Sequence, residues 1–147
     1  MKLGLLTAMF GDQPLSEVLK TIKPLGLETV ELGTGNYPGD PHCPTTELLA
    51  SKPKRDELLA LIKGEGLEIS ALSCHGNCLH PDPDFAKKNQ EVQTNTILLA
   101  EHLGVQTVID FSGCPGSDPH AKKPSWVTCA WPPDYLETLE YQWNDVV

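Results

Sequence analysis

The stretch that decides the fold is Glu68–Pro83, EISALSCHGNCLHPDP. Its first part, Glu68–Ser73, predicts a short buried strand, and a glycine-containing turn follows that Pro81 and Pro83 close. Polar and sulfur-bearing residues crowd into this turn: Ser73, Cys74, His75, Asn77, Cys78 and His80. In a barrel or an open parallel sheet, ligands bind at the loops that follow the strands' carboxyl ends. We therefore expect this turn to carry chemistry.

On either side of this stretch, expected strands alternate with expected helices. The expected strands are Leu3–Met9, Glu28–Leu32, Glu68–Ser73 and Val105–Phe111. The expected helices begin at Pro14, Thr45, Pro53, Pro83 and Tyr135, and Pro24, Gly64 and Gly104 mark ends. Asp82 is expected to cap the fourth helix, whose buried stripe is Val92, Thr96, Leu99 and Leu103. The last helix has its apolar stripe at Leu136, Leu139 and Trp143.

A repeated junction connects these units. Gly26-Leu27-Glu28, Gly66-Leu67-Glu68 and Gly104-Val105-Gln106 each end a helix and open a strand, with a period of roughly 40 residues. This pattern predicts an α/β fold of βαβ units with a parallel sheet. Four such strands are half of a (β/α)8 TIM barrel. We expect residues 1–147 to be a single N-terminal half of a barrel domain; a complete four-stranded open sheet is the alternative.

The composition limits the classes of function. With 39% hydrophobic and 21% charged residues, the chain is typical of a soluble globular protein, and no apolar run is long enough to cross a membrane. The net charge of −9 argues against a nucleic-acid partner. No signal-peptide pattern follows Met1, and the cysteines are odd in number: Cys43, Cys74, Cys78, Cys114 and Cys129. We expect reduced thiols in the cytoplasm.

Several polar residues are candidates for substrate contact. His75 follows the third strand, where a neutral imidazole can both donate a hydrogen bond to a ligand oxygen and accept one from a ligand hydroxyl. Glu31 lies near the end of the second strand and can orient His75 or bind a hydroxyl. Asp110 interrupts an apolar strand and should be paired or near the site. A loop-satisfied histidine, an exposed strand-end acid and a backbone-bonded aspartate are the respective alternatives.

The long loops add aromatic candidates and a possible zinc site. Asn36, Tyr37, Trp126 and Trp131 can line a substrate cavity or can simply pack within their loops. Cys74, His75, Cys78 and His80 are ligand types that suit zinc, although their spacing is not the paired one of zinc fingers. The expected substrate-binding set is Glu31, His75, Asn77, Asp110 and Trp131. No metal ligand is assigned, His75 being a candidate only.

Five segments resemble the xylose isomerase-like TIM-barrel superfamily, and within it the sugar phosphate isomerase/epimerase group. They are MKLGLLTAMFGDQPL (Met1–Leu15), ETVELGTGNYPGDPHCP (Glu28–Pro44), ISALSCHGNCLHPDPDFA (Ile69–Ala86), VIDFSGCPGSD (Val108–Asp118) and WVTCAWPPDYLETLEYQWN (Trp126–Asn144). The resemblance covers essentially the whole chain. HGNCLHPD and FSGCPGSD are its most specific parts.

The resemblance implies a metal-dependent isomerase or epimerase. In such enzymes a divalent ion (Mn, Mg, Co or Zn) polarises a sugar or polyol, and carboxylates move a proton between neighbouring carbons through an enediolate. The metal and catalytic residues come mainly from strands five to eight, so the resemblance places the catalytic residues in a missing C-terminal half. This chain alone is then expected to be inactive, with a sugar as the parent's substrate.

Two other functions remain open. One is a non-catalytic half-barrel that binds a ligand or forms a homodimer. The other is a phosphodiesterase resembling the metal-dependent abasic-site endonucleases of the same superfamily. His75 matches the first of their metal-ligating histidines, whereas Ser112 occupies the region of the second.

Overall fold

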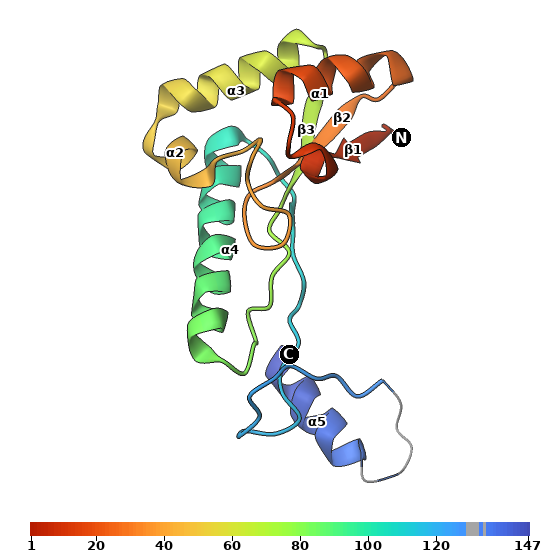
Figure 1. Cartoon of the computed structure of the whole chain (residues 1–147), viewed down its shortest axis with the longest axis vertical. Coiled ribbons are helices and arrows are strands. Elements are labelled where there is room, and N and C mark those ends of the chain that lie inside the picture. Colours follow the sequence, from red (N-terminus) through yellow and green to blue (C-terminus); the bar gives the residue numbers. More distant parts are fainter. Residues whose placement is uncertain (129–132, 134) are drawn as a thin grey trace. The chain divides into compact units, whose positions relative to one another are not determined.

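The computed structural model describes residues 1–128, 133 and 135–147 (Figure 1). Its strands are β1 (Gly4–Leu6), β2 (Thr29–Gly33), β3 (Glu68–Ser73) and β4 (Val108–Ile109). Its α-helices are α1 (Leu15–Ile22), α2 (Thr45–Ala50), α3 (Lys52–Gly64), α4 (Pro83–Leu103) and α5 (Tyr135–Val146). Two 3₁₀ turns, η1 (Thr7–Phe10) and η2 (Lys23–Leu25), follow β1 and α1. None of the described helices combines the length and apolar character needed to cross a lipid bilayer.

In the described part of the chain, the strands form one four-stranded sheet in the order β1-β2-β3-β4. All three pairings are parallel, because a helical crossover connects each strand to the next. The predicted α/β class with parallel strands is therefore confirmed, and the arrangement is that of a partial TIM barrel. The carboxyl ends of all four strands lie at the same end of the sheet.

The chain divides into two compact units, which we describe separately. The first unit comprises residues 1–75 and 92–110 and contains the sheet. Its core lies between the sheet and the helices that cover one face, α1 and α3 among them (Figure 1). The fully buried large side chains of this core are Leu19, Ile22, Leu32, Ile62, Leu72 and Leu99. On the helices and strands alike, these side chains occupy the core-facing positions that the apolar periodicity predicts.

An irregularity in β3 sets which side chains face this core. Val30 pairs with Ile69 and Glu31 pairs with Ala71, so Ser70 is an extra residue, a β-bulge. The Ser70 hydroxyl donates to the Val30 carbonyl at 3.1 Å. Because of the bulge, Ile69 and Leu72 both pack against the helix-side core although three positions separate them. Beyond Leu72 the ordinary alternation resumes.

Two predicted strands are shorter than the apolar pattern indicates. β1 ends at Leu6, which pairs with Glu31, and the expected continuation to Met9 is the 3₁₀ turn η1 instead. β4 consists of Val108 and Ile109, where Leu72 and Ser73 of β3 are its partners. β2 continues to Gly33 and β3 begins at Glu68, so each neighbouring strand is longer than the part of it that β1 or β4 pairs with. Apolar runs report burial and do not by themselves fix the length of a strand.

Other boundaries match the prediction closely. β3 and α2 have the predicted bounds, and α5 begins at Tyr135. Asp82 caps α4 as expected, since its Oδ1 accepts hydrogen bonds from the backbone N–H groups of Asp84 and Phe85 at 3.0 and 3.3 Å. Gly26 and Gly104 adopt left-handed φ angles of 78° and 70°, as helix-terminating glycines do.

The second unit comprises residues 76–91 and 111–147 and includes α5. The predicted apolar stripe of α5 is wrong as a buried face: Leu136 and Trp143 are 47% and 58% exposed. The buried residue of this helix among those described is instead Gln142. Its carboxamide forms hydrogen bonds with three backbone groups of the preceding segment. These bonds hold Gln142 against that segment and satisfy its polar atoms in the buried position.

Candidate functional site

The carboxyl ends of β2, β3 and β4 are tied together by backbone hydrogen bonds. Thr34 N–H donates to the Ser73 carbonyl at 2.9 Å, and Cys74 N–H donates to the Ile109 carbonyl at 3.0 Å. The loop after β2 is also bound to the residues after β3, because Tyr37 N–H donates to the His75 carbonyl at 3.0 Å. This carboxyl-terminal end of the sheet is therefore held in a defined arrangement, and we call it the rim. The side chains described next lie on it.

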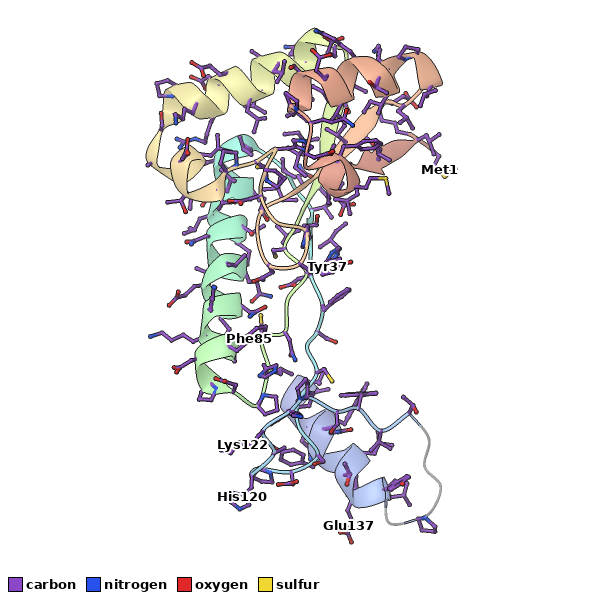
Figure 2. All side chains as sticks on the ribbon, viewed as in Figure 1. Met1, Tyr37, Phe85, His120, Lys122 and Glu137 are labelled. Carbon is purple, nitrogen blue, oxygen red and sulfur yellow. The ribbon has the colours of Figure 1, made fainter. Side chains whose placement is uncertain are left out.

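Side chains from the β2–α2 loop reinforce this rim. Asn36 adopts a left-handed φ of 53°, which is tolerated better by asparagine than by most residues, and its Nδ2 donates to the Cys74 carbonyl at 2.8 Å. The adjacent Tyr37 is 90% exposed and extends from the loop (Figure 2). Asn36 thus positions the loop, whereas the phenol of Tyr37 is available to a ligand.

Three buried threonines connect the rim to the helices. The Thr34 hydroxyl lies 2.8 Å from the hydroxyl of Thr96 on α4 and donates to the Ser73 carbonyl at 3.1 Å. The Thr45 hydroxyl, at the start of α2, donates to the Thr34 carbonyl at 2.8 Å. A satisfied buried network of this kind gives the rim one defined conformation.

His75 and Glu31 share a face of the sheet but are not adjacent. Val30 and Leu32 face the helices, so the alternation directs Glu31 to the opposite face, the one that a closed barrel would enclose. Continued beyond Ser73, the same alternation puts His75 on that face. Since Glu31 pairs with Ala71, His75 lies four residues further along, about 13 Å at the usual strand rise. Both side chains are half-buried. A ligand spanning several ångströms could touch both, but Glu31 does not orient His75 directly.

Asp110 follows β4 and is half-buried. Because Ile109 pairs with Ser73, the alternation gives Asp110 the side of the sheet that Val108 and Leu72 share. The rim thus brings Asp110 close to Cys74 along the ladder, but on the face opposite to His75. Its predicted contact with substrate stays a prediction.

In the second unit, Asn77 forms a clamp between two loops. Its Nδ2 donates to the Cys114 carbonyl at 2.8 Å, and its Oδ1 accepts from the N–H of Cys114 at 2.7 Å and of Leu79 at 3.2 Å. Asn89, 5% exposed, accepts the Asn77 N–H at 3.0 Å and donates to the Phe85 carbonyl at 2.8 Å. The carboxamide of Asn77 is therefore largely occupied by backbone groups that hold the loop in shape.

The remaining predicted residues have different surroundings. His80 packs on Phe85 with ring centroids 4.5 Å apart, and its Nδ1 accepts the Asp82 N–H at 3.0 Å, which is a local turn contact. Trp126 is 38% exposed. Trp131 lies outside the described residues, and its predicted substrate contact stays a prediction.

Two thiols, the buried Cys43 and the half-buried Cys114, are unsuited to nucleophilic chemistry. Burial raises the pKa of Cys43 to about 12, with Asp40 adding to the shift, and burial also raises the pKa of Cys114. A thiol must lose its proton to act as a nucleophile or a metal ligand. Cys43 therefore behaves as a small apolar core residue at neutral pH.

Sequence reasoning missed several buried polar side chains. Asn89 lies three residues before Val92, so it extends the buried stripe of α4 by about one turn. A polar residue at such a position needs a hydrogen-bond partner. His42 is 6% exposed and its Nε2 lies 2.8 Å from the Gln13 carbonyl, while its Nδ1 has no hydrogen-bond partner among the described residues. Nothing in the local pattern distinguishes His42 from an exposed loop histidine.

A cavity of about 580 Å³ lies at the other end of the sheet. Its lining includes Leu67 and Glu68 before and at the start of β3, and Gly104 and Val105 before β4. In parallel α/β folds the amino ends of the strands serve stability and the carboxyl ends serve ligands. We therefore do not assign the site to this cavity.

The fold and its rim define an α/β protein with the parallel strand order of a TIM barrel. The crystal structure of D-psicose 3-epimerase in the presence of D-fructose is similar to 75% of this chain, with a TM-score of 0.51 and 12% identity. The match covers 37% of that chain. At 12% identity this likeness concerns the fold alone, and it agrees with a partial TIM barrel.

A sequence relative extends over nearly the whole chain. The uncharacterized protein YfiH of Bacillus subtilis (strain 168) is 37% identical over 148 residues, which is 99% of this chain and 47% of the relative. The chain thus spans about half the length of the curated relative that it matches. No family model matches the chain.

Proposed function

We propose that this chain is the substrate-facing half of a sugar isomerase or epimerase barrel. The observation that carries the proposal is the parallel sheet in sequential order, with His75 fixed at its carboxyl edge. A ligand above this edge would meet side chains from several loops at once. The fold likeness to a sugar epimerase makes a sugar or polyol the favoured substrate class.

Within this proposal, His75 hydrogen-bonds a substrate oxygen. Its backbone is fixed by Tyr37, so the imidazole starts from a defined position. A neutral imidazole can donate from one nitrogen and accept at the other, which suits a hydroxyl or a carbonyl that becomes an enediolate oxygen. In this proposal the exposed Tyr37 and the half-buried Glu31 would add further contacts to the substrate.

The divalent metal belongs to the complementary half in this proposal. Among the described residues, no three His, Cys, Asp or Glu side chains are grouped so that they could hold an ion. That the metal ligands lie in the complementary half is part of the proposal. What this half contributes is binding, orientation and exclusion of water.

Complementation tests the proposal. This chain would be co-expressed with the part of YfiH outside the matched segment, and interconversion of D-fructose and D-psicose would be followed in D₂O with Mn²⁺ or Co²⁺. Proton transfer through an enediolate would place solvent deuterium on the epimerised carbon. We expect turnover from the pair and none from either part alone.

Matched histidine variants sharpen this test. His75→Ala should lower kcat/KM by about 10- to 100-fold, since a substrate oxygen loses its partner in a desolvated site. His80→Ala should change it less than about threefold, because the contacts described for His80 are local ones to Asp82 and Phe85. Equal losses in both variants, or a folded pair without deuterium incorporation, would refute the proposal.

A second candidate is a homodimeric half-barrel. In the described chain β1 and β4 each pair with one neighbour, so both sheet edges are open. Two copies related by a twofold axis could pair β4 of each with β1 of the other and close eight parallel strands. Sedimentation equilibrium distinguishes this candidate, because a monomer at 100 μM protein would exclude it.

A further inference from the structure

A second cavity, apart from the sheet, lies within the second unit. It has a volume of about 580 Å³ and is lined by Trp126, Leu139, Glu140, Trp143 and Asn144. A cavity of this size is in the range of small organic ligands. Four of its five lining residues come from one turn and a half of α5, and the fifth comes from the loop before it.

The buried Gln142 builds this cavity. It is 0% exposed, and its Oε1 accepts the Val127 N–H at 2.9 Å while its Nε2 donates to the Ser125 carbonyl at 2.8 Å. These two partners flank Trp126, so the backbone on both sides of Trp126 is bound to α5. Trp143 follows Gln142 directly on the helix. One carboxamide thus joins the segment that carries Trp126 to the helix that carries Trp143.

The lining is aromatic and acidic. Glu140 contributes a carboxylate with no ion-pair partner among the described residues, and no lining residue is basic. The other charged residues of α5, Glu137 and Asp145, are also acidic. The faces of indole rings carry negative electrostatic potential and attract cations, tryptophan most strongly of the aromatic residues. The charge and the rings therefore favour the same kind of ligand.

We propose that this cavity binds an organic cation of the quaternary ammonium type. The methyl groups would contact Trp126, Trp143 and Leu139, and the positive charge would lie near the Glu140 carboxylate. Asn144 can donate or accept a hydrogen bond to a polar group on the ligand. A neutral sugar can also stack on indole and donate hydroxyl hydrogen bonds to a carboxylate, but it has no positive charge to pair with Glu140. The charge of Glu140 thus separates the two ligand classes, and this site is independent of the sheet's rim.

Titrations of the whole protein with choline test the proposal. The indole N–H resonances of ¹⁵N-labelled protein, assigned with Trp126→Phe, Trp131→Phe and Trp143→Phe, would be followed at constant ionic strength. The neutral isostere 3,3-dimethylbutan-1-ol and D-glucose serve as comparison ligands. We expect choline to shift the resonances of Trp126 and Trp143 saturably, at least about fivefold more tightly than the isostere.

A pair of glutamate variants provides the matched control. Glu140→Gln should weaken choline binding about fivefold and leave binding of the isostere unchanged. Glu137→Gln removes the same charge from the same helix but lies outside the lining, and it should change affinity less than twofold (Figure 2). Unchanged amide spectra outside the cavity would show that each variant is folded.

Three results would overturn the proposal. They are the absence of saturable shifts with choline, equal binding of choline and its isostere, and tighter binding of D-glucose than of choline. Equal weakening by both glutamate variants would also contradict it, because the effect would then come from the helix's total charge and not from the cavity.

Discussion

The two units of the molecule are stabilised in different ways. The first unit, with the sheet, has an apolar core from strands and helices in which Leu19, Leu32 and Leu72 are 0% exposed. In the second unit the carboxamides of Asn77 and Gln142 bind the backbone of neighbouring segments. The first kind of stability comes from buried area, the second from satisfying backbone groups that a loop-rich segment cannot pair in a ladder.

The largest expected effect is in the first unit. Leu72→Ala removes a fully buried side chain between the sheet and its helices and should lower the free energy of unfolding by about 3 to 4 kcal/mol. Urea unfolding followed by circular dichroism measures this loss. The matched variant Leu136→Ala, at a 47% exposed position in α5, should cost less than about 0.5 kcal/mol. Similar losses would remove the contrast between the units.

Gln142→Ala should have the next largest effect. It leaves the Val127 N–H and the Ser125 and Gly116 carbonyls without their partner, at a cost of about 2 to 3 kcal/mol. Hydrogen exchange should show the loss of protection at the Val127 amide. Gln106→Ala, at an exposed position, is the control and should leave that amide unchanged.

Asn77→Ala should cost about 2 kcal/mol, since the side chain is only half-buried and water can replace part of its contacts. The amides of Cys114 and Leu79 should exchange faster by about 30-fold. Asn77→Asp keeps the acceptor oxygen and loses the donated hydrogen bond, so it should protect these amides to an intermediate degree. Full protection in Asn77→Ala would show that the clamp does not hold the loops.

The smallest expected effect depends on pH. The pKa of Cys43 is about 12 in the folded protein, above the ordinary value of 9, so the unfolded chain loses this proton first as pH rises. Stability should therefore begin to fall near pH 9, and the loss should reach about 1.4 kcal/mol at pH 10. Urea unfolding of Cys43→Ala should show a shallower decline than the parent, whereas Cys78→Ala should retain the parent's slope.

The same contrast explains what sequence reasoning could achieve. Apolar periodicity and the glycines at helix ends suffice to predict β3, α2 and the parallel sheet, because hydrophobic burial decides those elements. They fail for the end of β1 at Leu6, where the turn η1 takes the place of the expected continuation. They also fail for α5, where Gln142 is buried in place of Leu136 and Trp143.

The candidate site was predictable in part. The position of His75 after β3 follows from the turn that closes this strand, and the rim follows from parallel order. The contacts of Asn77 and the offset between Glu31 and His75 depend on register and on long-range hydrogen bonds. A single sequence carries no local signal for either, because both are set by residues far apart in the chain.

The bulge at Ser70 has a consequence for everything downstream in β3. Successive side chains of a strand point to alternate faces of the sheet, and a shift of the pairing by one residue reverses the face of every residue that follows. Removing Ser70 would leave Leu72 and His75 on their present sides, because Ala71 already pairs with Glu31 and Leu72 with Leu32. If Ser70 instead took a regular place in the ladder opposite Glu31, every residue after it would change sides, and Leu72 and His75 would exchange faces. The bulge at Ser70 thereby sets the face of the sheet on which the His75 side chain lies.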